Sequence, residues 1–269
     1  MSAAPSTPVP AFKHVWLLVM ENKSYSQIVG ASKAPYLNAL IAESGLAKAY
    51  QAVTHPSQPN YLALFSGSVQ GVKDDHPHDI SAPSIADQLE AAGLAWRVYA
   101  ENVPGGCSVK TKASGGPDGP GTYARKHEPA ISFTAISGDA GRCANIQPFS
   151  EFDPAAANFA FIAPNLCHDM HDCSIEIGDA FLKDFVPRIT GSAAWQDGGV
   201  LFITWDEGFR SARNLVPTIV VSALVSPGFT SATPHDHYSL LRTVQDGFGV
   251  ACLAESCKAN TLEEFFSAP

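Results

Sequence analysis

The chain has little positive charge for its size. Its 269 residues include 17 lysines and arginines against 26 aspartates and glutamates, which gives a formal net charge of -9. An acidic surface argues against non-specific binding to nucleic acid or to an anionic membrane. A site for an anionic substrate therefore needs local positive charge, and a metal ion is the most economical source of it.

Long apolar runs are also missing, and stable insertion into a membrane is not expected because a spanning helix needs about 20 apolar residues. The first residues, MSAAPSTPVPAF, contain no apolar segment of the kind that signal peptides carry. We expect a mature form behind an added Met, with residues 1–12 as an extended N-terminal arm. A hydrophobic share of 45% predicts a substantial core, and we expect one domain over residues 1–269.

The cysteines show neither C-x-x-C nor zinc-ribbon spacing. Their even number and close spacing favour disulfides, although spacing does not fix the connectivity and free thiols in a cytosolic protein are the alternative. The favoured pairs are Cys167–Cys173, Cys252–Cys257 and Cys107–Cys143. Oxidised cysteines predict a secreted or periplasmic protein.

Short apolar runs typical of buried strands are spread along the chain, with helical spacing between them. The expected strands are 14–20, 95–100, 158–163, 199–205 and 217–224, and the expected helices are 84–93, 174–189 and 238–249. Continuous apolar strands that alternate with helices predict an α/β fold with a mostly parallel central sheet covered on both faces. The Gly- and Pro-rich residues 102–121 are expected to form a long surface loop.

Acidic and amide side chains directly follow two of these strands. Glu21 and Asn22 come after the first strand, and Asp206 and Glu207 come after the fourth. Because ligands gather at the carboxyl ends of parallel strands, we expect both pairs at one edge of the sheet. Their oxygens suit Ca²⁺, Mg²⁺ or Mn²⁺, or Zn²⁺ if a histidine joins them. The alternative is that these are ordinary polar residues that cap the next helix.

Ser57 lies in the Pro-flanked turn HPSQP, ahead of an apolar helical segment that begins near Asn60. The N-terminus of a helix suits a phosphoryl group, although a simple N-cap serine is the alternative. The nucleophile elbow G-x-S-x-G is absent, which argues against an esterase of the α/β-hydrolase type. Several loops hold histidines, and His171 is expected near the same sheet edge because it follows the third strand by a short loop.

Five segments together resemble the bacterial phosphoesterase family. They are VWLLVMENKSYSQIVG, HPSQPNYLALFSG, PNLCHDMHDC, ITWDEG and HDHYSLLRTVQDGFG, and they appear in the family's order between about residues 14 and 249. The family contains secreted acid phosphatases and non-specific phospholipases C, and it belongs to the alkaline phosphatase superfamily. The resemblance implies an alkaline-phosphatase-like α/β/α sandwich.

The resemblance also implies a site for one divalent metal ion beside a nucleophilic serine. The implied metal ligands are Glu21, Asn22, Ser57, Asp206 and Glu207. The residues expected to face the phosphate are Asn60, His127, His171 and His237. Ser57 is the implied nucleophile, and His127 or His171 is expected to protonate the leaving group. His168 and Glu128 both stand where the family often has Asn, so His171 is preferred to His168.

These features predict metal-dependent hydrolysis of a small phosphate monoester through a phosphoserine intermediate. A phospholipase C or another phosphodiesterase is the alternative, although no exposed amphipathic membrane helix is evident and the chain ends soon after the last motif. A secreted protein that binds metal or phosphate without catalysis is a second alternative, and the hydroxyl of Ser57 argues against it. A sulfatase is disfavoured because SQPNY lacks the arginine of the sulfatase motif.

Overall fold

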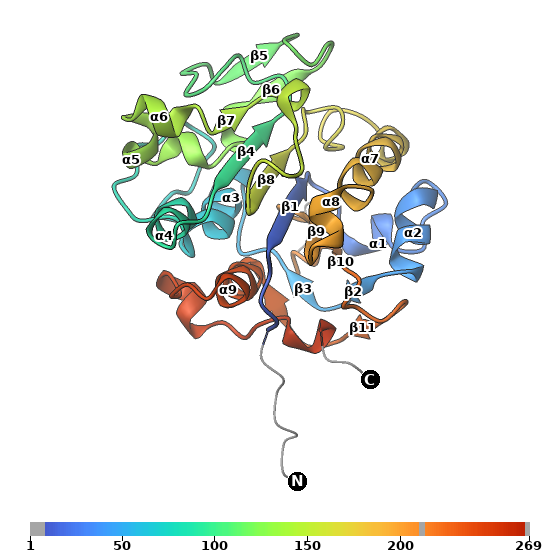
Figure 1. Ribbon diagram of the computed structural model, residues 1–269. Coiled ribbons are helices and arrows are strands. Elements are labelled where there is room, and N and C mark those ends of the chain that lie inside the picture. Colours follow the sequence, from blue (N-terminus) through green and yellow to red (C-terminus); the bar gives the residue numbers. More distant parts are fainter. Residues whose placement is uncertain (1–8, 210–212, 267–269) are drawn as a thin grey trace.

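An eight-stranded sheet forms the centre of the molecule (Figure 1). The computed structural model describes residues 9–209 and 213–266, so most of the expected N-terminal arm lies outside the described residues. All five expected strands are present in this sheet. They are β1 (His14–Met20), β4 (Trp96–Ala100), β8 (Phe159–Ala163), β9 (Gly199–Trp205) and β10 (Thr218–Val221).

The sheet is mostly parallel, which confirms the predicted fold class. Its strand order is β11-β2-β10-β9-β1-β8-β4-β7. β1 pairs in parallel with both β8 and β9, while β10 is antiparallel to its two neighbours. The central strands are buried on both faces, which explains why they appear in the sequence as unbroken apolar runs.

The remaining strands are only two or three residues long, too short to carry a recognisable period. Three of them complete the main sheet, and the other four form two small ladders, β12 with β3 and β5 with β6. They are β2 (Gly45–Ala47), β3 (Tyr50–Gln51), β5 (Lys112–Ser114), β6 (Thr122–Ala124), β7 (Ile146–Gln147), β11 (Thr230–Ser231) and β12 (His235–Asp236).

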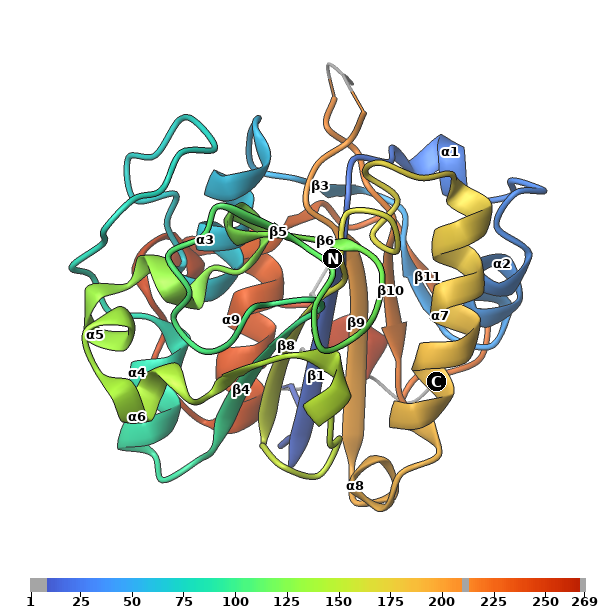
Figure 2. The same cartoon turned by 90° about the horizontal axis from the view of Figure 1, so that it is seen from above.

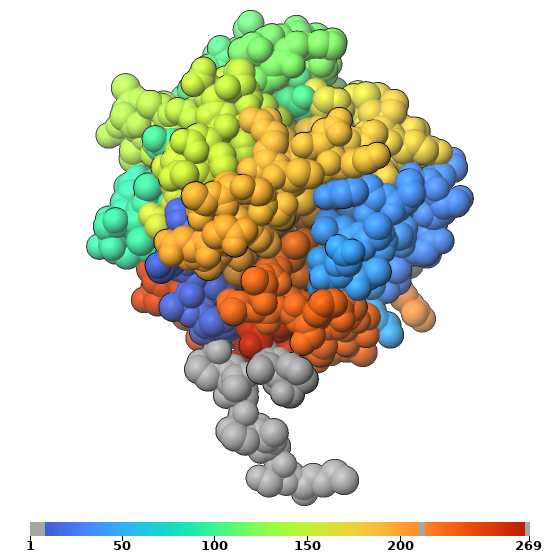
Figure 3. Space-filling model, turned by 45° about the vertical axis from the view of Figure 1, so that its right-hand side comes forward, coloured from blue at the N-terminus to red at the C-terminus, as the bar shows by residue number. Residues whose placement is uncertain are grey.

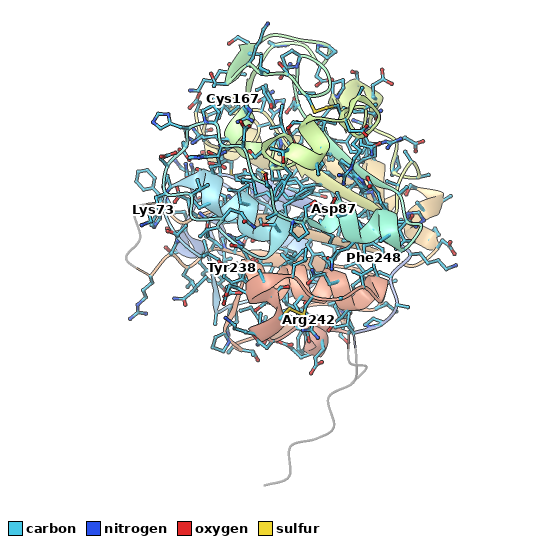
Figure 4. All side chains as sticks on the ribbon, turned by 90° about the vertical axis from the view of Figure 1, so that its left-hand side faces the viewer. Lys73, Asp87, Cys167, Tyr238, Arg242 and Phe248 are labelled. Carbon is cyan, nitrogen blue, oxygen red and sulfur yellow. A yellow bond between two sulfur atoms is a disulfide. The ribbon has the colours of Figure 1, made fainter. Side chains whose placement is uncertain are left out.

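Helices cover both faces of the sheet, as Figure 2 shows from above. One face carries α1 (Tyr25–Ile28), α2 (Pro35–Ala42), α7 (Ile175–Thr190) and α8 (Ala193–Gln196). The other carries α3 (Ser57–Ser66), α4 (Ile85–Ala91), α5 (Thr134–Ser137), α6 (Ala140–Cys143) and α9 (His237–Phe248). In Figure 4, with Tyr238 and Phe248 labelled towards the ends of α9, this helix lies beneath α3. The layers are those of an α/β/α sandwich.

Local sequence signals set the ends of several helices. α4 begins with a capping box, in which the Asp87 carboxylate accepts hydrogen bonds from the Ser84 N–H and hydroxyl at 2.7 and 2.9 Å. α3 ends at Gly67, which has a φ of 71° and lies against the Leu253 carbonyl, where a larger residue would collide.

One helix end is held by a residue far away in the sequence. The backbone N–H groups of Tyr36 and Leu37, in the first turn of α2, donate to the buried carboxylate of Asp179 in α7 at 2.9 and 2.8 Å. The carboxylate satisfies two donors that a helix leaves open at its N-terminus. This contact joins α2 and α7, which lie side by side in Figure 3.

The expected surface loop over residues 102–121 contains one short strand. This strand, β5, pairs antiparallel with β6, which follows the loop and is mostly buried. The segment is tied at its start by the disulfide Cys107–Cys143, and the other two favoured pairs, Cys167–Cys173 and Cys252–Cys257, are also disulfides. In the described parts of the chain no helix has both the length and the apolar character to cross a membrane.

Candidate active site

The loops that leave β1, β8 and β9 are tied together at one edge of the sheet. β1 and β9 are parallel with Met20 opposite Trp205, so Glu21 and Asp206 emerge side by side. The Asp206 N–H donates to the Met20 carbonyl at 2.9 Å, and the Glu21 N–H donates to the carbonyl of Asp169 at 2.8 Å. Both acidic pairs therefore lie at one edge of the sheet, as the strand pattern predicts.

Asn22 turns the chain sharply after β1. Its φ of 50° is in the left-handed region, which asparagine tolerates better than most residues. In this conformation the Asn22 N–H donates to Asp206 Oδ1 at 3.1 Å. The turn therefore fixes the Glu21–Asn22 pair against the loop after β9.

Ser57 is the first residue of α3 and points at Glu21. Its hydroxyl donates to Glu21 Oε2 at 3.1 Å, and Tyr61, one turn later on the same helix, donates to Oε1 at 2.6 Å. All three side chains are buried. The hydroxyl therefore meets the acidic sheet edge at a helix N-terminus, where backbone N–H groups favour an anion.

Lys126 supplies positive charge beside Ser57. Its Nζ lies 3.5 Å from Ser57 Oγ and 2.9 Å from Asp75 Oδ2, and the other oxygen of Asp75 accepts from the N–H of Gln58 at 3.0 Å. Burial disfavours the charged amine, but the Glu21 and Asp75 carboxylates outweigh it and raise the pKa of Lys126. Sequence reasoning missed Asp75 and the role of Lys126, and the position of Lys126 beside His127 in RKHEP was the available signal.

His127 lies between two carboxylates. Its Nε2 is 3.2 Å from Glu21 Oε1 and its Nδ1 is 3.3 Å from Asp169 Oδ2, while its ring stacks on Tyr61. Neither ring nitrogen makes an aligned hydrogen bond. Burial, together with the charges of Lys126 and His171, lowers the pKa of His127 well below its usual value. No role was predicted for Asp169, although it lies in the segment PNLCHDMHDC.

His171 lies at the opening of the same group of residues. Its ring centre is 6.1 Å from that of His127, its side chain is 29% exposed, and its Nδ1 is 2.6 Å from Asp172 Oδ1. The backbone N–H of His171 donates to Asp169 Oδ1 at 2.7 Å. The imidazole is therefore both close to the buried carboxylates and open to solvent. We call Glu21, Asn22, Ser57, Lys126, His127, Asp169, His171, Asp206 and Glu207 the Ser57 cluster.

The carboxylates of the Ser57 cluster lie too close together to be charged independently. Burial, followed by repulsion from neighbouring carboxylates, raises the pKa of Glu21 well above its usual range. Burial also raises the pKa of Asp169 well above normal and that of Asp206 to about 7, with repulsion as a further cause in each case. For Glu207, burial and then Asp75 raise the pKa to about 7. A bound cation would remove this conflict.

The donor set fits a hard cation in its chemistry. Asn22 Oδ1, Asp169 Oδ2 and Asp206 Oδ2 are buried and have no hydrogen-bond partner, which is costly unless another ligand satisfies them. In residues 9–209 and 213–266, no three His, Cys, Asp or Glu side chains are arranged to hold a metal ion by themselves. A cation here would therefore also draw on amide and hydroxyl oxygens, for which Asn22 and Ser57 are in place.

Two of the expected substrate-binding residues are already occupied by the protein. Asn60 accepts from the N–H groups of Val53 and Thr54 and donates to two nearby carbonyls, so it holds the turn before Ser57. His237 Nε2 is 2.7 Å from the Asp206 carbonyl and its Nδ1 is 3.0 Å from the Tyr50 hydroxyl. The polar atoms of Asn60 and His237 are therefore engaged within the protein, and a contact of either residue with phosphate stays a prediction.

His168 and Glu207 occupy different positions relative to the Ser57 cluster. His168 lies outside the Ser57 cluster, since its Nδ1 is 2.8 Å from Glu101 and its ring stacks on Phe181. Glu207 lies at the edge of the cluster, where its Oε2 contacts Nδ1 of the half-exposed His55. His55 precedes Pro56 in the HPSQP turn, and no role was predicted for its side chain.

Comparison with known proteins identifies the family of this chain. The profile of the phosphoesterase family matches residues 31–251. A phosphatidylinositol-3-phosphatase of Mycobacterium tuberculosis is 35% identical over 254 residues, which cover 91% of this chain and 80% of that protein. A probable acid phosphatase of Kluyveromyces lactis is 31% identical over 268 residues, but the match covers only 62% of its length and 94% of this chain.

Solved structures share the fold at low sequence identity. A phosphonate monoester hydrolase from Silicibacter pomeroyi has a TM-score of 0.64 at 12% identity, over 96% of this chain and 77% of that chain. A Vibrio parahaemolyticus protein of the alkaline phosphatase superfamily has a TM-score of 0.56 at 14% identity, over 91% of this chain and 69% of that chain. The chain therefore belongs to the phosphoesterase family and is a phosphoric ester hydrolase, and it shares the fold of the solved structures named above.

Proposed function

We propose that this hydrolase cleaves phosphate monoesters through a phosphoserine at Ser57. The supporting observation is the position of Ser57 Oγ at the start of α3, 3.1 Å from Glu21 Oε2 and 3.5 Å from Lys126 Nζ. A hydroxyl placed between a proton acceptor and a cation, at a helix N-terminus, suits attack on phosphorus. The acid phosphatase names of several relatives are consistent with this reaction.

In the first step, Ser57 Oγ bonds to phosphorus as the bond from phosphorus to the alcohol oxygen breaks. The hydroxyl proton leaves along the hydrogen bond to Glu21 Oε2. Lys126 and the first turn of α3 stabilise the charge on the phosphoryl oxygens. His171, the more accessible of the two histidines, donates a proton to the departing alkoxide.

In the second step, water attacks the phosphoserine and releases inorganic phosphate. His171, now neutral, takes a proton from that water, and Ser57 Oγ regains its proton from Glu21. Each step inverts the configuration at phosphorus, so the net result is retention. The two histidines differ in role because His127 is fully buried between Glu21 and Asp169, where it orients the carboxylates rather than meeting the leaving group.

The proposal includes one bound divalent cation. Glu21, Asn22, Ser57, Asp206 and Glu207 are the residues that would hold it, and its identity among Ca²⁺, Mg²⁺, Mn²⁺ and Zn²⁺ is open to measurement. When bound, it lowers the pKa of the serine hydroxyl and withdraws charge from the phosphoryl oxygens. The three disulfides, which persist in oxidising compartments, support a secreted or periplasmic location.

A phosphodiesterase, including a phospholipase C, is the alternative within the same family. The small probes p-nitrophenyl phosphate and p-nitrophenylphosphorylcholine separate the two reactions, and we expect faster turnover of the first. The non-catalytic alternative is set aside by the family assignment.

The test of the covalent route is to trap the intermediate. Protein mixed with a phosphate monoester and quenched rapidly in acid should contain phosphoserine in the peptide with Ser57, detected by mass spectrometry. Ser57→Ala is the control and should yield no phosphopeptide and no turnover. Full turnover by purified Ser57→Ala protein would exclude the covalent route.

A further inference from the structure

A pocket with a volume of about 280 Å³ opens beside Ser57. Its polar lining consists of Gln58, Asp75, Thr111, Lys112, Arg125 and Lys126, and of these the mechanism above uses only Lys126. Gln58 directly follows Ser57 in α3, and Lys126 reaches from this pocket to within 3.5 Å of Ser57 Oγ. The pocket therefore adjoins the place where phosphorus is attacked.

This pocket is basic, although the chain carries a net charge of -9. Lys112, Arg125 and Lys126 line it together with the single carboxylate of Asp75. That carboxylate is already engaged, since its oxygens are 2.9 Å from Lys126 Nζ and 3.0 Å from the N–H of Gln58. Lys112 and Arg125 remain as positive charge that no carboxylate of the lining balances.

Arg125 is the most informative of these residues. It is only 8% exposed, its Nη1 has no hydrogen-bond partner, and it makes no ion pair with any carboxylate in the described ranges. A buried guanidinium is costly without an anion, so its retention at a pocket wall indicates a ligand.

The nearest acidic residue along the chain, Glu128, does not form an ion pair with Arg125. Glu128 is buried, and its oxygens accept from the N–H of Ile131 at 3.3 and 3.2 Å. Burial raises the pKa of Glu128 to about 8, so this carboxyl is mostly protonated at neutral pH. Attraction to Arg125 opposes this rise in the pKa of Glu128, but no ion pair joins the two side chains in the described ranges.

We propose that this pocket binds a second phosphate group, carried by the alcohol part of the substrate while Ser57 attacks the first. The planar guanidinium of Arg125 can donate two parallel hydrogen bonds to phosphate oxygens, and Lys112 adds charge from the exposed side. The favoured substrates are then phosphate monoesters whose leaving alcohol bears a further phosphate. This inference rests on the proposed monoesterase function and narrows it.

Glucose 6-phosphate and glucose 1,6-bisphosphate form a matched test pair, because they differ by one phosphate group. We expect kcat/KM for the bisphosphate to exceed that for the monophosphate by about tenfold or more. Arg125→Gln should abolish most of this preference, Lys112→Gln should reduce it by about threefold, and Arg125→Lys should keep part of it. Lys110→Gln is the matched control, an exposed lysine on the same segment outside the lining, and it should leave the ratio unchanged.

The selectivity ratio is measured within each protein sample, so a fraction of unfolded protein does not alter it. If Arg125→Gln does not fold, the exposed Lys112→Gln variant carries the test. The inference is overturned if the wild-type protein shows no preference, or if the preference survives in both glutamine variants. A preference only for a carboxylate, seen with 3-phosphoglycerate against glycerol 3-phosphate, would also overturn the assignment to phosphate.

A binding measurement separates this inference from the monoesterase proposal. With Ser57→Ala protein, calorimetry should give a dissociation constant for glucose 1,6-bisphosphate about tenfold below that for glucose 6-phosphate. Arg125→Gln in the same background should remove the difference. Wild-type protein that hydrolyses neither sugar phosphate nor p-nitrophenyl phosphate would contradict the monoesterase proposal, while equal dissociation constants would contradict the second phosphate site alone.

Discussion

Two buried groups of polar residues lie near one another in this fold, and they differ in how their atoms are satisfied. In the first, His237 contacts the Tyr50 hydroxyl and the Asp206 carbonyl at hydrogen-bond distance, and the neighbouring buried His235 is paired with the half-buried Glu264. In the second, the Ser57 cluster, three buried oxygens and both nitrogens of His127 have no aligned partner. Buried polar atoms normally have hydrogen-bond partners. We therefore infer that the first group has a structural role and that the second binds a ligand.

The two groups meet at Asp206. Its carbonyl accepts from His237, and its carboxylate lies in the Ser57 cluster, where burial and repulsion raise the pKa to about 7. The hydrogen bond from His237 thus helps to hold Asp206, a residue of the Ser57 cluster, in position. This comparison predicts that changes in the Ser57 cluster alter activity far more than stability, whereas changes at His237 do the reverse.

Removing divalent cations should have the largest effect on activity, and it tests whether the Ser57 cluster binds a cation. Chelation followed by dialysis should lower the turnover of p-nitrophenyl phosphate by roughly 10²-fold or more, because a cation supplies several kcal/mol of stabilisation to the transition state. Adding back single divalent cations should restore the rate and identify the ion. An unchanged rate in protein shown by elemental analysis to be free of metal would contradict the cation site.

The same cation-free protein should show an unusual dependence of stability on pH. Burial and charge repulsion raise the pKa values of Asp206 and Glu207 to about 7 in the folded state, against about 4 in the unfolded chain. The folded state then holds protons that the unfolded state has lost, so the free energy of unfolding falls as the pH rises from about 4 to about 7. A bound cation should flatten this slope, which urea denaturation with and without the ion can measure.

Lys126 is expected to have the next largest effect. Lys126→Gln removes the charge 3.5 Å from Ser57 Oγ and should lower kcat by about 10- to 100-fold, since a positioned cation stabilises the transferring phosphoryl group. Lys126→Arg should retain more activity because it keeps the charge.

Lys73→Gln is the matched control for Lys126. Lys73 is an exposed lysine two residues before Asp75, labelled at the edge of Figure 4, and its removal should leave kcat within about twofold. Steady-state kinetics on purified variants with matched melting temperatures gives the comparison. Equal losses in Lys126→Gln and Lys73→Gln would show that the charge acts on the protein as a whole rather than at Ser57.

The sheet was predictable because its central strands leave a strong signal in the sequence. β1 and β9 are unbroken apolar runs of seven residues that match the expected boundaries, and their parallel pairing brings Glu21 beside Asp206. The short strands β2, β7 and β11 were missed because two or three residues show no period, and their pairing is set by contacts distant in sequence.

The limits of prediction at the site have a different cause. Asn60 and His237 are residue types that can bind phosphate. In the fold their polar atoms are engaged in hydrogen bonds with Thr54 and Tyr50. Sequence spacing does not reveal these contacts. Lys126 was undervalued because a lysine in a loop is usually solvated. Only the fold shows that the 3₁₀ turn Arg125–His127 brings this side chain to Ser57.

His237 should have the smallest effect on catalysis and the clearest effect on stability. Burial lowers the pKa of His237 to about 4, with the nearby Asp206 carbonyl opposing the shift, whereas an unfolded histidine titrates near 6.5. The neutral imidazole therefore stabilises the fold fully above about pH 6.5. As the pH falls from about 6.5 towards 4, the unfolded state takes up the proton first, so the free energy of unfolding falls by about 3 kcal/mol.

In His237→Gln the amide can still reach one former partner but does not titrate. The variant should be less stable than the wild type at pH 7, by about 1 kcal/mol, and the difference should shrink or reverse as the pH falls from 6.5 to 4. His76→Gln, at an exposed histidine, should parallel the wild type in urea denaturation across this range. KM for p-nitrophenyl phosphate should stay within about threefold in His237→Gln. A large rise in KM without a change in the stability profile would instead place His237 at the phosphate and remove the distinction between the two groups.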